Sequence, residues 1–275
     1  MARILHLSDL HFGRERFALV PRLIETVTQL APDAVVVSGD LTQHATEAQF
    51  SQARAFLDAL PAPVLSVPGN RDLSPWNMYR RLLRPFERWT RLIHETTEPM
   101  LDIKGARIVG INSVDPLALH RGYISEAALD RACAQLSAAP KEALRIIVMH
   151  HPFYRPDESG KSTMRAALVA AQALAEAGGD LILCGHLHHR MSSTFALLEG
   201  RRSLLNIESG SSLAMSNTGS SNNFNLIECS PSHTQVTNYE CTAQSMTFRP
   251  VRQSNFRAAG PRQGWLGSSV KLNDF

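Results

Sequence analysis

The chain has 275 residues, of which 44% are hydrophobic and 19% charged, and its formal net charge is +3. This is the composition of a globular protein with enough apolar material for one large domain or two small ones. The small net charge argues against a protein whose main partner is nucleic acid.

The four cysteines show no C-x-x-C pairing, which fits a reduced protein without disulfides. No apolar run reaches 18 residues, and residues 1–8 lack the long apolar core of a signal peptide. These patterns predict a cytoplasmic protein with no transmembrane segment. Residues 250–275, rich in Arg, Gly, Ser and Asn, are expected to form a basic tail with little fixed structure. Docking of this tail on an anionic surface or a neighbouring subunit is the alternative.

Buried strands and amphipathic helices alternate through the first part of the chain. Strands are expected at Arg3–Asp9, Asp33–Asp40 and Pro63–Asn70. Helices are expected from about Pro21 and over Thr46–Pro61. The second helix should bury one face, composed of Phe50, Ala53, Phe56, Leu57 and Leu60. This β-α-β-α-β order predicts a parallel sheet covered by helices.

The later elements continue this pattern and then change it. They are a helical stretch around Tyr79–His94, two strands around a turn at Lys104-Gly105, a helix capped by Ser125, and strands at Leu144–His151 and Asp180–His186 that flank a helix near Thr163–Ala177. Beyond His189 the strands are short and joined by turn residues, as in antiparallel pairing. The sequence therefore predicts an α/β fold with a parallel first half and an antiparallel last third.

Polar side chains of the kinds that bind metals follow the apolar strands, at the point where each strand ends. The seven residues are Asp9, His11, Asp40, Asn70, His150, His186 and His188. Because the carboxyl ends of the strands in an open α/β sheet form its ligand crevice, these side chains are expected to meet. Seven donors exceed the four that one zinc ion takes, and they suit two cations that share a carboxylate.

The spacing of these residues supports one common site. In "DLH" and "HLH" the two donors are two positions apart, so in extended chain both point to the same side. Glycine precedes Asp40, Asn70 and His186, and it would let the backbone turn sharply and approach a bulky site closely.

The phrases "LHLSDLHFG", "VVSGDLT", "PVLSVPGN" and "GHLH" resemble the calcineurin-like metallophosphoesterase superfamily over roughly residues 1–240. The resemblance implies a four-layer α/β/β/α sandwich, here a domain of residues 1–249. It also implies two cations of Mn, Fe, Zn or Co, no organic cofactor, and a bridging hydroxide that attacks phosphorus. The resemblance assigns Asp9, His11, Asp40 and His188 to one metal, and Asp40, Asn70, His150 and His186 to the other. His151 and His189 would lie beside the ligands.

One position departs from the family pattern. The family usually has G-N-H-[DE], whereas this chain has "GNRD", with Arg71 in place of the histidine. A guanidinium stays protonated, so it can hold phosphate oxygens but cannot donate a proton in turnover. Bracing of the loop by pairing with Asp72 or another acid is the alternative role. The same phrase resembles the UDP-2,3-diacylglucosamine hydrolases, whereas the surrounding phrases resemble the bacterial cyclic-nucleotide phosphodiesterases.

These patterns and the resemblance favour a phosphodiesterase of a small nucleotide-type substrate, such as a 3′,5′-cyclic nucleotide, with Asp40, Asn70, Arg71 and His151 as catalytic residues. Arg71, Tyr154 and Arg155 are the candidate substrate-binding residues, although the last two are equally typical of a solvated loop. If a poor leaving group departs, its proton must come from His151, His189, His44 or metal-bound water. A pyrophosphohydrolase, a nuclease for DNA ends and a non-catalytic metal-binding scaffold remain alternatives, and the oligomeric state stays open.

The segment "SPWNMYRRLLRPFERWTRLI" mixes arginines with four aromatic residues. Such mixtures bind nucleic acid or lipid surfaces in some proteins. The favoured interpretation is a helix that buries Trp76, Tyr79, Phe86 and Trp89 and exposes its arginines.

Overall fold

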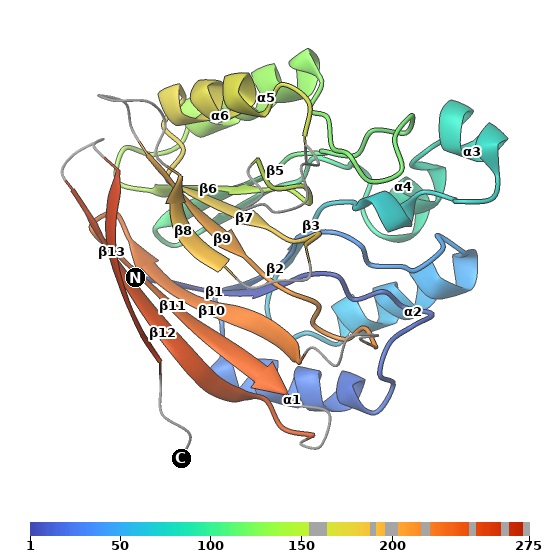
Figure 1. The fold of residues 1–275 in the computed structure, drawn as a ribbon, viewed down its shortest axis with the longest axis horizontal. Coiled ribbons are helices and arrows are strands. Elements are labelled where there is room, and N and C mark those ends of the chain that lie inside the picture. The colour runs from blue at the N-terminus through green and yellow to red at the C-terminus, as the bar shows by residue number, and fades with distance from the viewer. Residues whose placement is uncertain are drawn as a thin grey trace.

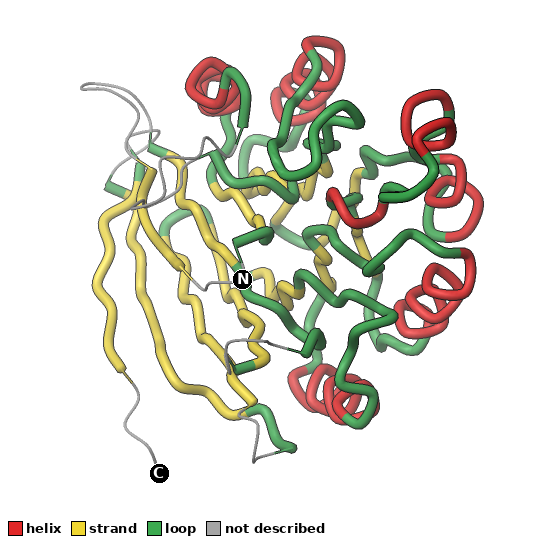
Figure 2. The backbone as a smooth tube through the Cα atoms, turned by 45° about the vertical axis from the view of Figure 1, so that its right-hand side comes forward, coloured by secondary structure: helices red, strands yellow, loops and turns green. Residues whose placement is uncertain are grey.

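The computed structural model describes residues 1–153, 164–187, 191–195, 203–215, 221–241, 246–259 and 264–271. Two β-sheets pack face to face, and helices cover their outer faces (Figures 1 and 2). This arrangement confirms the four-layer α/β/β/α sandwich that the resemblance implied.

The first sheet has the strand order β13-β12-β11-β10-β1-β2-β3. Its strands are β1 (Ala2–Leu7), β2 (Ala34–Val37), β3 (Val64–Ser66), β10 (Asn222–Ser230), β11 (His233–Cys241), β12 (Arg249–Ala258) and β13 (Trp265–Lys271). The second sheet has the order β4-β5-β6-β7-β9-β8. Its strands are β4 (Met100–Ile103), β5 (Ala106–Gly110), β6 (Leu144–Val148), β7 (Leu181–Cys184), β8 (Met191–Phe195) and β9 (Leu204–Glu208).

The helices follow the expected positions closely. They are α1 (Leu19–Leu30), α2 (Glu47–Asp58), α3 (Met78–Leu83), α4 (Glu87–Leu92), α5 (Glu126–Ser137) and α6 (Ala167–Glu176), with a 3₁₀ turn, η1, at Asn70–Asp72. Ser125 caps α5 as predicted, since its hydroxyl accepts a hydrogen bond from the Ala128 N–H. The stretch expected at Tyr79–His94 is two helices because Pro85 cannot continue the first one.

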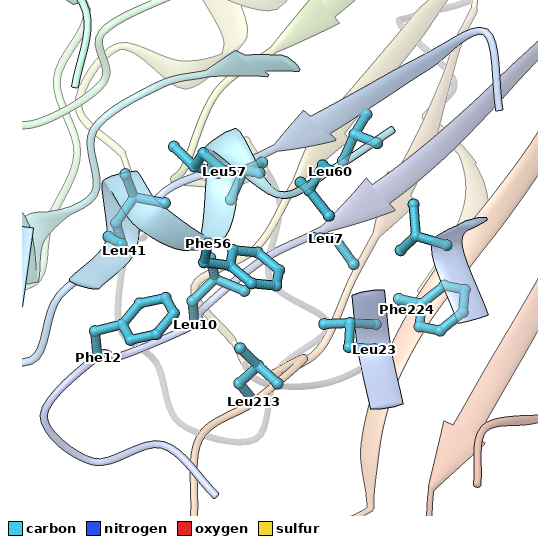
Figure 3. Close-up of a cluster of buried hydrophobic side chains, with 14 of the residues drawn as sticks. Leu7, Leu10, Phe12, Leu23, Leu41, Phe56, Leu57, Leu60, Leu213 and Phe224 are labelled. Atoms are coloured by element: carbon cyan, nitrogen blue, oxygen red, sulfur yellow. The ribbon is translucent and has the colours of Figure 1, made fainter. Parts of the chain in front are cut away.

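Three apolar layers hold the sandwich together. Helices α1 and α2 pack on the outer face of the first sheet, where Leu23 and Phe56 lie near Leu7 (Figure 3). All five residues of the predicted α2 face are buried. A second layer, which includes Ile4 and Ile146, fills the space between the sheets, and a third joins α5 and α6 to the second sheet. Burial of apolar surface of this kind is the main favourable term in folding.

Parallel pairing brings the ends of the central strands to one edge of the sandwich. β1, β2 and β3 run parallel in the first sheet, and β5, β6, β7 and β9 run parallel in the second. The antiparallel pairing expected for the last third holds for β10 to β13 and for β8 with β9. It does not hold for β9 against β7.

Part of the segment expected to be an unstructured tail is regular structure. β12 and β13 extend the first sheet, with Ala258 paired to Trp265. Phe256 and Trp265 are buried, and the Trp265 indole N–H donates to the Asp180 carbonyl oxygen at 3.2 Å. These two aromatic anchors supply the apolar burial that the polar composition of the segment conceals. Residues 272–275 lie outside the described residues.

Two further expectations concern membranes and thiols. Within the described ranges no helix combines the length and apolar character needed to cross a bilayer. None of the four cysteines forms a disulfide, and Cys184, Cys229 and Cys241 are buried.

Candidate metal centre

Three of the expected ligands form one buried cluster after β1 and β2. The Nε2 atom of His11 lies 3.5 Å from Asp9 Oδ1 and 3.7 Å from Asp40 Oδ2. All three side chains are almost inaccessible to solvent. Their potential ligand atoms lie within 4.8 Å of one another, which is close enough to bind one cation.

A second group lies beside the first. Asn70 Oδ1 is 3.2 Å from His150 Nε2 and 3.1 Å from His186 Nδ1, and the two imidazole nitrogens are 3.2 Å apart. These residues follow β3, β6 and β7, as the strand-end argument predicted. Asp40 Oδ1 is 3.5 Å from His150 Nε2, so this carboxylate lies between the two groups.

The structure therefore brings together six of the seven expected ligands. The seventh, His188, lies outside the described residues, as do His189, Tyr154 and Arg155. Their predicted roles stay predictions.

The backbone at these ligands differs from our expectation. Asp9, His11, Asp40 and His186 all have positive φ, between 50° and 72°. The side chains of "DLH" converge because both residues adopt this left-handed conformation, and not because the chain is extended. Non-glycine residues rarely adopt it, and such strain gathers at functional sites.

The glycines that precede Asp40, Asn70 and His186 are needed mainly because neighbouring atoms leave no room for a Cβ, and less because the backbone turns there. Of the three, only Gly39 has positive φ, at +96°. A Cβ at Gly39 would lie 2.6–2.9 Å from atoms of the His150 side chain, and one at Gly185 would overlap Ser8 Oγ. Glycine thus lets the backbone of one segment approach the ligands of another.

A Gly39→Ala variant is expected to lose about 1–3 kcal/mol of unfolding free energy and to bind metal more weakly, because the new methyl group must displace the His150 ring. Gly105→Ala is the matched control, since Gly105 also has positive φ but its Cβ would meet no atom within 4 Å. Urea unfolding and metal titration of both variants check this. Equal metal affinity in the two variants would contradict it.

Hydrogen bonds from outside the cluster orient the ligands. His150 Nδ1 lies 2.8 Å from the Ser38 carbonyl oxygen, so it carries the proton and leaves Nε2 available to a cation. The Ser8 hydroxyl donates to Asp9 Oδ2 at 2.6 Å. Sequence reasoning missed both serines, although Ser8 and Ser38 stand directly beside the motif letters in "LSDLH" and "VVSGD".

The electrostatics of the cluster suit bound cations. Burial raises the pKa of Asp40 well above its usual range, and the neighbouring Asp9 carboxylate raises it further. At His11, burial lowers the pKa, but the hydrogen bond with Asp9 and the charges of Asp40 and Asp9 outweigh it, and the net shift is upward. A cation would relieve the cost of these buried carboxylates. Carboxylate, amide and imidazole donors together fit Mn, Fe, Zn or Co.

His151 lies directly beside the histidines of the second group. Its ring centroid is 4.6 Å from that of His186, and its Nδ1 is 3.0 Å from the Ser113 hydroxyl. Its buried Nε2 has no hydrogen-bond partner among the described residues. The lowered pKa of His151 follows from burial first and from the neighbouring histidines second. The sequence placed His151 near the site, but nothing in the sequence pointed to Ser113.

The structure argues against a bracing role for Arg71. The Asp72 carboxylate accepts hydrogen bonds from the N–H groups of Leu41, Thr42 and Gly69 and from the Thr42 hydroxyl. Arg71 contributes its N–H to Asp40 Oδ1 at 2.8 Å. Asp72 therefore braces the loop through backbone donors, and it forms no ion pair with the Arg71 guanidinium.

Two packed sheets with carboxylate, amide and imidazole groups at their strand ends define a class of metal-dependent hydrolases. A family model described as calcineurin-like phosphoesterase matches residues 2–190. The chain belongs to this family, and it is a phosphoric ester hydrolase.

The chain is similar to curated proteins that are named as phosphodiesterases. The chain is 30% identical to glycerophosphodiester phosphodiesterase GpdQ of Enterobacter lignolyticus, over 68% of this chain and 70% of that protein. It is 27% identical to a probable cyclic nucleotide phosphodiesterase of Rhodococcus erythropolis, over 70% and 67% of the two chains. It is 28% identical to a cAMP/cGMP dual specificity phosphodiesterase of Mycobacterium tuberculosis, over 70% and 63%.

Solved structures show the same fold at low sequence identity. Purple acid phosphatase PPD1 from yellow lupin (Lupinus luteus) seeds has a TM-score of 0.64 at 12% identity, covering 90% of this chain. The present chain spans about half of that phosphatase, 52% of its length. Vacuolar protein sorting 29 from Cryptosporidium parvum has a TM-score of 0.51 at 13% identity, covering 94% and 98% of the two chains.

Proposed function

We propose that this phosphoesterase is a dinuclear-metal phosphodiesterase that acts on a small nucleotide-type diester, with 3′,5′-cyclic nucleotides as the first candidates. The observation that carries the proposal is the position of Asp40. Its two carboxylate oxygens face different groups, Oδ2 toward His11 at 3.7 Å and Oδ1 toward His150 at 3.5 Å. A carboxylate in this position suits two cations that share it.

In this proposal Asp9, His11, Asp40 and His188 hold one cation, and Asp40, Asn70, His150 and His186 hold the other. Bound cations supply an activated water near neutral pH and neutralise charge on phosphoryl oxygens. The protein itself keeps these donors fixed through Ser8, Ser38 and the Asp72 loop. It also excludes bulk water from them, which strengthens every charge interaction in the site.

Arg71 supports binding of the phosphate in this proposal. Its N–H donates to Asp40 Oδ1, which fixes its backbone beside the site, and the residue is partly exposed. From there the guanidinium can hold phosphate oxygens at two points. Because Arg71 cannot donate a proton, we assign protonation of a poor leaving group to His151, with His44 as the described alternative.

The relatives and Arg71 point to different leaving groups. The three relatives named above are phosphodiesterases for glycerophosphodiesters or cyclic nucleotides, whose leaving groups are alkoxides. A guanidinium in place of the family histidine favours a leaving group that needs no acid, as in a nucleotide-sugar or lipid-linked diphosphate. That pyrophosphohydrolase is our second candidate.

The test uses metal-stripped protein reloaded with Mn²⁺, with bis(p-nitrophenyl) phosphate, 3′,5′-cyclic AMP and a UDP-sugar as substrates. Turnover of cyclic AMP would support the first candidate. Turnover restricted to the UDP-sugar, with or without the activated diester, would replace it with the second. Metal binding with no turnover of any substrate would favour a metal-binding scaffold on the same fold.

Replacement of the arginine gives a direct prediction. Arg71→Ala is expected to lower kcat/KM by about tenfold to a hundredfold, because it removes one charge-assisted hydrogen bond to phosphate. Arg71→Lys should lower kcat/KM by less, because lysine keeps the positive charge. Bound metal should be unchanged because only the backbone of Arg71 contacts a ligand. Steady-state kinetics and metal analysis of both variants check this. Loss of metal in Arg71→Ala would show instead that the residue supports the loop.

A further inference from the structure

Helix α3 buries one of its two arginines, Arg81, and turns its apolar side chains outward. Arg81 is buried, and its guanidinium donates to the carbonyl oxygens of Pro116 at 2.9 Å and Ala118 at 2.5 Å. On the same helix Tyr79 and Leu83 are exposed, and Trp76 just before it is 83% exposed. A helix that packed only for stability would have the opposite orientation.

The apolar side chains gather on two neighbouring segments. Of the 14 large hydrophobic residues exposed in the described part of the chain, seven lie within 76–83 and 117–119. Arg81 joins these segments, because it bonds to the carbonyl oxygens on either side of Leu117, which is itself 82% exposed. We call residues 76–83 and 117–119 the apolar rim. An exposed apolar patch of this kind marks an interaction surface.

Positive charge borders the apolar rim. Residues 75–93 contain five arginines and one glutamate, in a chain whose total charge is +3. Arg80 and Arg84 share the partner Glu87, at 3.4 Å and 3.2 Å; Arg84 is exposed and Arg80 is half-buried. With Arg88 they line a shallow pocket that also includes Ser74. The pocket lining also includes Asp72, so three guanidinium groups face two carboxylates, and this border keeps a net positive charge.

We propose that the apolar rim docks on the surface of an anionic phospholipid membrane. Aromatic and aliphatic side chains next to arginines are the combination that enters the lipid headgroup region. Trp76 and Tyr79 carry a polar group on an apolar ring, which suits this boundary. α3 lies at the edge of the molecule in Figure 1, so a flat surface can reach it.

Two other possible partners of the apolar rim, nucleic acid and a second copy of the chain, fit it less well. Nucleic acid would use the aromatic rings and arginines, but it would leave exposed leucines such as Leu83, Leu117 and Leu119 without a partner. A second copy in a two-fold contact would place Arg80 and Arg84 near their own symmetry mates, where like charges repel.

The protein carries its own fluorescent probe, Trp76. Of its three tryptophans, Trp89 and Trp265 are buried, so a change in emission on docking reports Trp76. Vesicles of phosphatidylglycerol and phosphatidylcholine should shift this emission to the blue and co-sediment with the protein. Pure phosphatidylcholine should bind weakly, and added salt should release the protein. None of these readouts depends on phosphodiesterase activity.

Paired variants separate the apolar and charged contributions. Tyr79→Ser with Leu83→Ser should reduce vesicle binding by tenfold or more, as estimated from the apolar surface lost. Leu168→Ser with Val169→Ser on α6, also exposed, should not reduce it. Arg80→Gln with Arg84→Gln should weaken binding by about fivefold per charge. Arg22→Gln with Arg54→Gln, which removes two exposed arginines from α1 and α2, should have little effect.

Three outcomes would overturn the proposal. The first is no binding to anionic vesicles, and the second is equal binding by the rim variants and their controls. The third is a change in Trp76 emission with single-stranded nucleic acid but not with vesicles, or a dimer of the parent protein that the rim variants lose while vesicles are not bound. That result would assign the apolar rim to nucleic acid or to self-association.

Discussion

An Asp40→Asn variant is expected to lose phosphodiesterase activity by about three orders of magnitude or more, the loss expected when a main source of transition-state charge stabilisation is removed. The carboxylate faces His11 with one oxygen and His150 with the other. Its amide replacement keeps the shape but offers one neutral oxygen in place of two charged ones. The protein should therefore bind less than its full complement of metal, which metal analysis of the purified variant would measure.

The same substitution should not destabilise the metal-free protein. Burial and the Asp9 charge raise the pKa of Asp40, so its ionised form costs folding free energy without a cation. Metal-free Asp40→Asn should melt at an equal or higher temperature than the parent, whereas Mn²⁺ should raise the Tm of the parent more than that of the variant. Asp58→Asn, an exposed position paired with Arg54, is the control. A variant that unfolds without metal would show a structural role instead.

The position of the site could be predicted from the sequence because strand ends locate it. Asp9, Asp40 and Asn70 follow three apolar runs, and parallel pairing requires those ends to lie at one edge. Local backbone could not be predicted in the same way. The left-handed conformation of Asp9 and His11 depends on contacts with other segments, such as the bond from the Asp9 N–H to the Gly39 carbonyl oxygen.

The structures of β12 and α3 differ from our predictions for a common reason. β12 buries few large apolar side chains, chiefly Phe256, so its residues lack the alternation that identifies a strand. On α3 the aromatic and aliphatic residues suggested a buried face, yet Tyr79 is exposed and Arg81 buried. The composition of a segment shows that apolar residues are present, but only tertiary contacts determine which face of the helix or strand is buried. The expectation did hold for Trp89 on α4, which is fully buried.

Glu208 at the end of β9 should make stability depend on pH. Burial raises the pKa of its carboxyl from 4.5 to about 7, although the Asn206 side chain donates to it at 2.9 Å. The folded protein therefore holds a proton that the unfolded chain releases between about pH 4.5 and 7. The contribution of this group to stability is best below pH 4.5 and is lost as the pH rises to 7 and beyond, by about 3 kcal/mol.

Glu208→Gln should remove this dependence because glutamine is neutral and its oxygen can still accept the Asn206 hydrogen bond. At pH 8 the variant should be more stable than the parent by about 3 kcal/mol, and near pH 4.5 the two should agree. Urea unfolding at both pH values measures the difference in unfolding free energy between variant and parent. The other titrating groups contribute equally to both proteins, so their effects cancel in this difference. Glu25→Gln, an exposed position on α1, should show no such change. A constant difference between parent and Glu208→Gln at both pH values would contradict this prediction, because it would mean that the pKa of Glu208 is the same in the folded and unfolded protein.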